Sequence, residues 1–202
     1  MATTTKRSPV AAVMNLPNQL TVARLILSVA LFALMAYEFY LSGLVVFLLA
    51  VSTDWLDGYF ARKWGQVTTL GRILDPFVDK VIICGTFILL VGVSDVSGLK
   101  QWLRPWMAVV IVGRELLVTA LRGFIEQQGI DFSAKLQGKL KMVLQCVAAA
   151  VCLFYLSRAV SAAPPAAWLG WAVVVTVWLA VVVTITSGLE YVIRTVILLR
   201  RT

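Results

Sequence analysis

Residues 54–79 read DWLDGYFARKWGQVTTLGRILDPFVD and place four aspartates, three basic residues and three glycines in a chain that is otherwise mostly apolar. A carboxylate at membrane depth is costly, so it is rare and usually marks an ion, proton or substrate site. Four carboxylates within 26 residues therefore predict a functional site here.

The composition on both sides of this stretch predicts an integral membrane protein. Hydrophobic residues make up 60% of the 202 residues, against roughly 45–50% in soluble domains, and the mean hydropathy is +0.90. A spanning helix needs about 20 apolar residues. Six runs approach or exceed this length, at residues 20–41, 44–61, 74–93, 102–121, 140–156 and 168–199.

We therefore expect an all-α, polytopic membrane protein with six transmembrane helices. Residues 1–19 are predicted to be a cytoplasmic N-terminal segment, in which residues 8–14 could form a short interfacial helix before Pro17. Residues 20–202 would then form one membrane domain with short loops. The chain has no histidine, and its three cysteines lie in apolar runs, which disfavours zinc sites and disulfides.

The net charge of +8 could suggest nucleic acid, but the basic residues are distributed as expected for orientation in a bilayer. With the N-terminus inside, all 18 lysines and arginines except Lys100, Arg104 and Arg158 fall on the inner side. The positive-inside rule then places both chain ends and the aspartates on the cytoplasmic side of the cell (inner) membrane. We expect no nucleic-acid partner.

Helical spacing turns the aspartate stretch into a predicted geometry, because residues three or four apart share a helix face. Asp54 and Asp57 would form a stripe at the inner end of the second helix, and Asp75 and Asp79 another at the start of the third. Residues 63–70 would make the reversal. The four carboxylates would then converge on one small volume.

Four unpaired carboxylates this close would repel one another, and two divalent cations would neutralise them. Oxygen-only ligation suits Mg²⁺ or Mn²⁺, which also bind phosphate oxygens, so the stretch points to phosphoryl-group transfer. The alternative is a set of structural ion pairs between the aspartates and the nearby cations Arg62, Arg72 and Lys80.

Smaller residues in the stretch fit a phosphate-bearing ligand. Gly58 and Gly71 leave the backbone open to a bulky group, and Ala61 leaves the carboxylate face unobstructed. Arg62 can bind phosphate oxygens through a bidentate fork. Because proline is tolerated in a first helical turn, Pro76 predicts that the third helix starts close to Asp75, with a kink as the alternative.

The pattern D-x-x-D-G-x-x-A-R, then eight residues, then G-x-x-x-D-x-x-x-D resembles the signature of the CDP-alcohol phosphotransferases. These membrane enzymes transfer a substituted phosphate from a CDP-linked donor to an alcohol. The resemblance implies six transmembrane helices, a homodimer and two metal ions near the cytoplasmic face. It covers most of the chain, from about residue 15 to the final helix.

The resemblance also implies roles for single residues. Asp54, Asp57 and Asp75 would be metal ligands, and Asp79 would be both a ligand and the general base. The residues that bind the CDP part of the donor would be Asn18, Thr21, Gly58, Ala61, Arg62, Thr68 and Gly71. For the stretch around Asn18 and Thr21 the alternative is a helix cap with a snorkelling Arg24.

The other basic residues of the same membrane face are the candidates for binding the acceptor alcohol. They are Arg114, Arg122, Lys135, Lys139 and Lys141. Such a set could bind a second phosphate, whereas a neutral alcohol would need less of it. The alternative is that these residues contact lipid head groups. Arg114 lies deeper in its apolar run, where Glu115 or a motif aspartate could pair with it.

Residues 113–122 (GRELLVTALR) and 135–145 (KLQGKLKMVLQ) resemble the family members that use glycerol 3-phosphate as the acceptor, except that Met142 replaces a threonine. The implied reaction transfers the phosphatidyl group of CDP-diacylglycerol to glycerol 3-phosphate and gives phosphatidylglycerol phosphate and CMP. Alternatives are the same transfer to phosphatidylglycerol or an inositol phosphate and, from another class, a divalent-cation transporter. A membrane prenyltransferase is disfavoured because its aspartates lie on well-separated helices.

Overall fold

The structure is a computed structural model that describes the backbone of residues 16–64, 69–97, 99–127, 136–161 and 165–199. Within these ranges it describes the side chains except those of residues 16–18, 54–64, 69–76, 94–97, 100, 126–127, 136–139 and 199. The segment at 8–14, where an interfacial helix is conceivable from sequence, lies outside the described residues.

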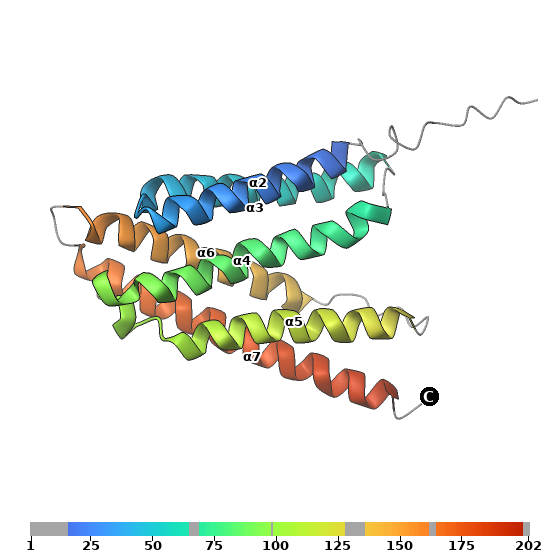
Figure 1. Cartoon of the computed structure of the whole chain (residues 1–202). Coiled ribbons are helices and arrows are strands. Elements are labelled where there is room, and N and C mark those ends of the chain that lie inside the picture. The colour runs from blue at the N-terminus through green and yellow to red at the C-terminus, as the bar shows by residue number, and fades with distance from the viewer. Residues whose placement is uncertain (1–15, 65–68, 98, 128–135, 162–164, 200–202) are drawn as a thin grey trace, which may run out of the picture. The chain divides into compact units, whose positions relative to one another are not determined.

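The described chain is all-helical, as predicted (Figure 1). Each of the six predicted apolar runs corresponds to one α-helix, and the described residues contain no strand. The helices are α2 (Leu16–Ala36), α3 (Tyr40–Trp64), α4 (Thr69–Ser97), α5 (Pro105–Gln127), α6 (Leu136–Ala159) and α7 (Ala167–Leu199), with a short 3-10 helix, η1 (Leu99–Gln101), before α5.

Three helices are long and apolar enough to cross a membrane by length and composition, within the part of the chain that the structure describes. The apolar windows are Gln19–Ala36 in α2, Leu140–Ala159 in α6 and Ala167–Leu198 in α7, and α3 has a shorter one, Tyr40–Thr53. The charged residues of the predicted site lie largely on α3, α4 and α5.

The third helix begins earlier than the sequence predicts. Because α3 continues to Trp64 and α4 begins at Thr69, only residues 65–68 separate the two helices, instead of the predicted reversal over 63–70. The predicted start close to Asp75 is therefore wrong. Pro76 lies in the eighth position of α4, beyond the first turn, and the helix continues through it.

The chain divides into two compact units, Met1–Ile82 and Ile83–Thr202, with the boundary inside α4. In the first unit α2 and α3 lie side by side (Figure 1). The buried face of α2 carries Thr21, Arg24, Ser28, Leu31 and Met35, at alternating spacings of three and four residues. This spacing keeps one face of the helix turned to its neighbours.

The packing of α3 on α2 uses a small residue. A Cβ atom on Gly43 of α3 would lie 3.6 Å from Leu31 Cδ1 and 3.7 Å from Met35 Cγ, which is van der Waals contact. Lipid tails are as apolar as these side chains, so close packing of this kind holds helices together in a bilayer. The opposite face of α2 exposes Val22, Ile26 and Val29, as expected for a surface that meets lipid.

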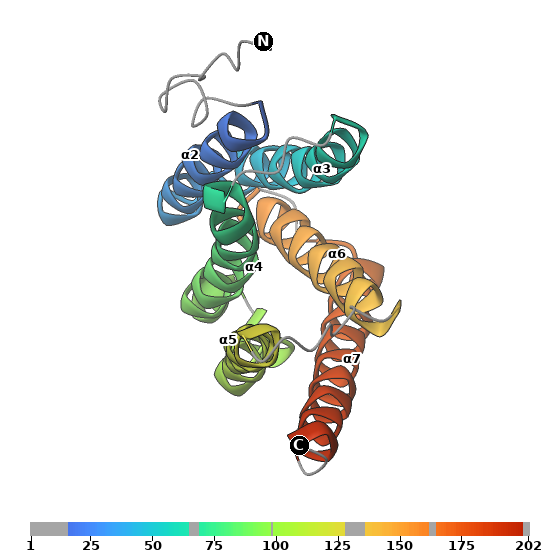
Figure 2. The same cartoon turned by 90° about the vertical axis from the view of Figure 1, so that its right-hand side faces the viewer.

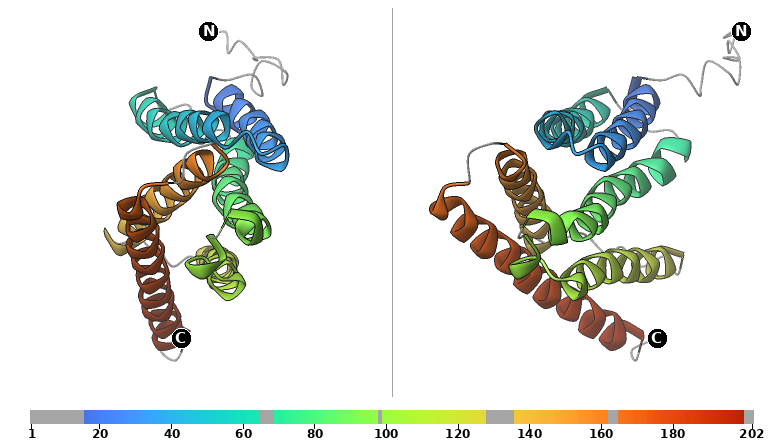
Figure 3. Two further views of the ribbon diagram at one scale, coloured as in Figure 1. Left: turned by 90° about the vertical axis from the view of Figure 1, so that its left-hand side faces the viewer. Right: turned by 60° about the vertical axis from the view of Figure 1, so that its left-hand side comes forward.

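In the second unit α7, with 33 residues, packs against both α5 and α6 (Figure 2 and Figure 3). The buried residues of α7 follow the same three-and-four spacing. They are apolar in its first half, at Val173, Val177 and Ala180, and polar further on, at Thr184 and Ser187. The core of this unit therefore changes from apolar to polar along α7.

A tight turn at residues 37–39 joins α2 to α3. Phe39 N donates to Leu34 O at 2.8 Å and Glu38 N to Met35 O at 3.1 Å, the pair of bonds that closes a helix in the Schellman motif. Glu38 occupies the left-handed position of this motif, with φ at 62°. Glycine is the usual residue there because a Cβ atom is strained in that conformation.

We expect Glu38→Gly to stabilise the protein by about 1 kcal/mol, because it removes the strain of a left-handed non-glycine residue. The apparent Tm in detergent should rise by about 2–4 °C. Glu38→Ala is the matched control, because it removes the same charge but keeps the Cβ atom. An equal rise in Tm for Glu38→Ala would attribute the effect to charge and contradict the prediction.

Candidate functional site

The aspartate motif lies on two helices, as the sequence predicts. Asp54 and Asp57 are three residues apart on α3, and Asp75 and Asp79 are four residues apart on α4. Each pair therefore shares a helix face. The side chains of Asp54, Asp57 and Asp75 lie outside the described residues, so their predicted convergence stays a prediction.

Asp79 has a described side chain, and it forms an ion pair with α2. Arg24 Nη1 donates to Asp79 Oδ1 at 2.5 Å, with the arginine side chain 1% exposed and the aspartate 24% exposed. The alternative of a snorkelling Arg24 is therefore wrong. A guanidinium buried this deeply needs a counter-charge, and Asp79 supplies it. Arg24 thus fixes one oxygen of the predicted general base.

The predicted donor-binding residues are only partly described. Thr21 lies on α2 one turn before Arg24, on the same buried face, and is 1% exposed. For the others the structure gives helix positions without side chains, with Asn18 on α2, Gly58, Ala61 and Arg62 on α3, and Gly71 on α4. Thr68 lies outside the described residues.

Metal binding would involve the motif aspartates. Among the described side chains no group of three or more His, Cys, Asp or Glu residues could hold a metal ion, but three of the four motif aspartates are not among them. The donor set is made only of carboxylates, two on each of two helices, and Asp79 retains partial exposure. Such a set fits hard divalent cations such as Mg²⁺ or Mn²⁺.

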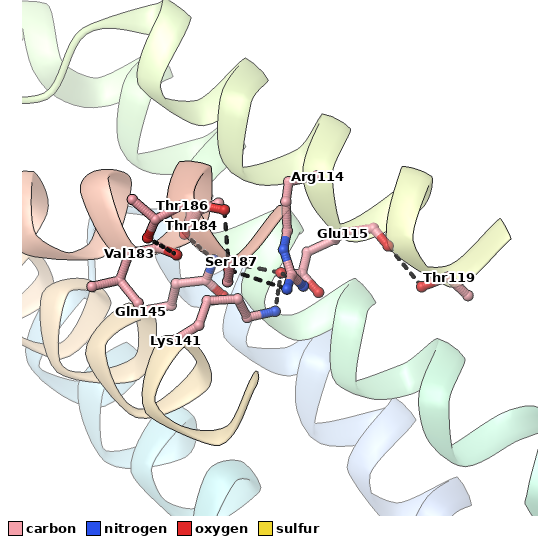
Figure 4. Close-up of polar contacts among 9 residues, drawn as sticks. All are labelled: Arg114, Glu115, Thr119, Lys141, Gln145, Val183, Thr184, Thr186 and Ser187. Atoms are coloured by element: carbon pink, nitrogen blue, oxygen red, sulfur yellow. Dashed lines mark hydrogen bonds and ion pairs between the residues drawn. The ribbon is translucent and has the colours of Figure 1, made fainter. Parts of the chain in front are cut away.

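The second unit contains a buried polar cluster centred on Glu115 of α5 (Figure 4). Lys141 Nζ of α6 donates to Glu115 Oε1 and forms an ion pair with it. Gln145 Nε2, one turn further along α6, lies 3.5 Å from the same oxygen and donates to Thr184 Oγ1 of α7 at 2.9 Å. The cluster thereby connects α5, α6 and α7.

Arg114 lies beside Glu115 and also reaches α7. Its Nη2 donates to Ser187 Oγ at 3.1 Å, and its Nη1 lies 3.6 Å from Glu115 Oε1. The Arg114 side chain is 11% exposed. Its Nε atom is buried and has no hydrogen-bond partner in the described part of the structure. A buried donor without a partner is costly, so this nitrogen is suited to an incoming acceptor oxygen.

The predicted acceptor-binding residues are thus brought together in part. Arg114 and Lys141, from different helices, meet at Glu115, which confirms Glu115 as the partner of Arg114. Arg122 is partly buried, about two turns further along α5. Lys139 lies on α6 without a described side chain, and Lys135 lies outside the described residues.

Sequence reasoning missed the uncharged members of the cluster and the role of Arg24. Gln145, Thr184 and Ser187 are at most 5% exposed, although they are polar residues in apolar helices. The available signal was their spacing, because Gln145 follows Lys141 by four residues and Ser187 follows Thr184 by three. For Arg24 the available signal was a charged residue in an apolar helix, one turn after Thr21.

Comparison with known proteins gives a family and several relatives. The family model described as CDP-alcohol phosphatidyltransferase matches residues 14–190. A Bacillus subtilis protein named CDP-diacylglycerol–glycerol-3-phosphate 3-phosphatidyltransferase is 34% identical over 193 residues, covering 88% of this chain and 93% of the relative. A protein of the same name from Escherichia coli K12 is 31% identical over 186 residues, covering 88% and 92%. Another from Pseudomonas fluorescens is 40% identical over 120 residues, covering 57% and 58%.

We expect Arg24→Leu to lower the free energy of unfolding in detergent by about 3 kcal/mol, because it leaves Asp79 without its buried counter-charge. The double variant Arg24→Leu/Asp79→Leu should recover a large part of this loss, since it removes both charges. Denaturant titration measures both values.

Arg104→Leu provides the control, because Arg104 is an exposed arginine just before α5. Its free energy of unfolding should stay close to that of the wild type. An equal loss for Arg24→Leu and Arg104→Leu, or no recovery in the double variant, would contradict an ion pair that stabilises the fold.

Proposed function

Because the chain belongs to the CDP-alcohol phosphatidyltransferase family, we propose that it transfers the phosphatidyl group of CDP-diacylglycerol to glycerol 3-phosphate. The products are phosphatidylglycerol phosphate and CMP. The relatives that align over most of the chain carry the name of this reaction. The acceptor is the part of the proposal that the described side chains support directly.

The observation that carries the choice of acceptor is the meeting of Arg114 and Lys141 at a single carboxylate, Glu115. Among these three side chains two cations face one anion. The phosphate of glycerol 3-phosphate would supply negative charge and acceptor oxygens to Arg114. A neutral alcohol such as glycerol would supply no such charge.

Asp79 is the proposed general base. In this role its carboxylate takes the proton from the primary hydroxyl of glycerol 3-phosphate. The oxygen forms a bond to the phosphorus that bears diacylglycerol, and the bond from that phosphorus to CMP breaks. Arg24 holds Asp79 Oδ1 and so limits how the carboxylate can turn. Arg62 would bind phosphate oxygens of the donor.

Asp54, Asp57, Asp75 and Asp79 would hold two divalent cations, Mg²⁺ or Mn²⁺. When bound, such ions bind the diphosphate and stabilise the charge on the departing oxygen. The support for this assignment is the carboxylate-only donor set on α3 and α4.

For the arrangement in the cell we propose a multi-pass protein of the cell (inner) membrane, with both chain ends and the aspartate motif on the cytoplasmic side. The support is the distribution of lysine and arginine along the chain. We further propose a homodimer, as the family resemblance implies. Labelling of cysteines introduced at either chain end tests the orientation, and cross-linking in intact membranes tests the dimer.

The proposed reaction is tested by CMP release from purified protein in detergent with CDP-diacylglycerol. We expect release with glycerol 3-phosphate and much less with glycerol, which lacks the anionic phosphate. Release with inositol phosphate and with phosphatidylglycerol should also be much lower, because the first has only secondary ring hydroxyls and the second is a bulky lipid. Addition of EDTA should abolish release, and excess Mg²⁺ or Mn²⁺ should restore it. Preference for another acceptor would overturn the choice of glycerol 3-phosphate, and no release with any acceptor would favour the transport alternative.

Asp79→Asn should remove nearly all turnover, with binding of CDP-diacylglycerol largely retained, because the amide cannot take the proton of the acceptor hydroxyl. The measurements are CMP release and donor binding by calorimetry. Glu38→Gln, which alters an exposed carboxylate in the turn between α2 and α3, is the matched control and should keep wild-type turnover. Near-normal turnover in Asp79→Asn would contradict the role of Asp79 as the base.

A further inference from the structure

The contact between Arg114 and α7 is unusually close at Gly188. A Cβ atom on Gly188 would lie 3.0 Å from Arg114 Cγ and 3.9 Å from Arg114 Nε. Arg114 Cγ is only two bonds from the α5 backbone, so it cannot move away without a change of rotamer or a shift of the helix. The absence of a side chain at Gly188 therefore allows the arginine stem to lie against α7.

The neighbouring residue, Ser187, fixes the far end of the same side chain. Arg114 Nη2 donates to Ser187 Oγ at 3.1 Å, and the Ser187 hydroxyl donates its own hydrogen to Thr184 O, also at 3.1 Å (Figure 4). Because that hydrogen is committed to the backbone, the lone pairs of Oγ remain for the guanidinium. Ser187 is 5% exposed, so water competes little for this contact.

The anion beside Arg114 is shared with other groups. Glu115 Oε1 accepts a hydrogen bond from Lys141 Nζ. Gln145 Nε2 lies 3.5 Å and Arg114 Nη1 lies 3.6 Å from the same oxygen. Arg114 is thus placed more by α7 than by its neighbouring carboxylate. Its Nε has no hydrogen-bond partner within the described residues. The guanidinium is held in place but not fully satisfied.

We propose that Ser187 and Gly188 of α7 are positioning residues that hold the Arg114 guanidinium where it binds the phosphate of the acceptor. This inference rests on the proposed function, because it assigns an anionic acceptor to Arg114. It gives the last helix a part in acceptor recognition, in addition to crossing the membrane. The substrate class addressed is a small alcohol that carries a phosphate group.

Gly188→Ala is the first test, because the added methyl group forces Arg114 Cγ to move by a few tenths of an ångström. We expect KM for glycerol 3-phosphate to rise by about tenfold, because this factor corresponds to the loss of roughly one charged hydrogen bond. KM for CDP-diacylglycerol should stay unchanged. Gly113→Ala is the matched control, since a Cβ atom there meets nothing within 4 Å although the residue adjoins Arg114. It should behave as the wild type.

Ser187→Ala tests the second contact and should also raise KM for glycerol 3-phosphate, whereas Ser187→Thr keeps a hydroxyl and should largely restore it. Thr186→Ala is the control on the same helix, because the Thr186 hydroxyl donates to the Val182 and Val183 carbonyls of α7 itself. Figure 4 shows the contact with Val183. Equal KM values for Ser187→Ala and Thr186→Ala would overturn the role of Ser187.

A purely structural role for α7 is separated from positioning by the Arg114→Ala background. If Gly188 acts through Arg114, adding Gly188→Ala to the Arg114→Ala variant should not raise KM for glycerol 3-phosphate any further. The apparent Tm of the single variant Gly188→Ala should stay near that of Gly113→Ala. A further rise in KM in that background would overturn the inference. If the wild type itself releases no CMP with glycerol 3-phosphate, the proposed function fails, which is a different and distinguishable result.

Discussion

A charge inside a bilayer must be compensated by an opposite charge or by hydrogen bonds, and this constraint determines which polar side chains of the chain meet. Arg24 is 1% exposed and lies against Asp79. Lys141 and Arg114 lie against Glu115. Arg24 and Asp79 come from α2 and α4, and Lys141 of α6 reaches Glu115 of α5, whereas Arg114 is the neighbour of Glu115 on α5 itself. The ion pairs therefore fix the helix register at the same points where the chemistry is proposed.

The two ion-pair clusters involve different helices and different cations. Arg24 of α2 forms an ion pair with Asp79 of α4, so the arginine can orient this carboxylate. Around Glu115 two cations share one carboxylate, and the proposed binding of an anionic acceptor rests on this arrangement. The first ion pair orients a carboxylate, and the second brings together cations of the kind that bind phosphate. This division of roles is consistent with a transfer reaction that has two substrates.

The helices and the register of the aspartates were predictable, because apolar length and three- or four-residue spacing are local properties of the sequence. The start of α4 was not, because the interpretation of Pro76 assumed that proline marks a first turn, whereas the helix begins seven residues earlier at Thr69. Arg24 was misread as a possible snorkelling residue because its partner, Asp79, is 55 positions away. The contact of Gly188 with Arg114 depends on how two helices pack, which one-dimensional spacing does not give.

The residues of α7 that were missed share a physical property. Aspartate, arginine and lysine are expensive in an apolar environment, so each one within a membrane helix stands out in the sequence. Serine, threonine and glycine are inexpensive there, because a hydroxyl can bond to its own helix backbone and glycine has no side chain to bury. Helix α7 reaches a mean hydropathy of 2.3 within Ala167–Leu198 although it holds Thr184, Ser187 and Gly188. A hydropathy profile therefore identifies such a helix only as a membrane span and does not reveal the residues in it that position a charged side chain.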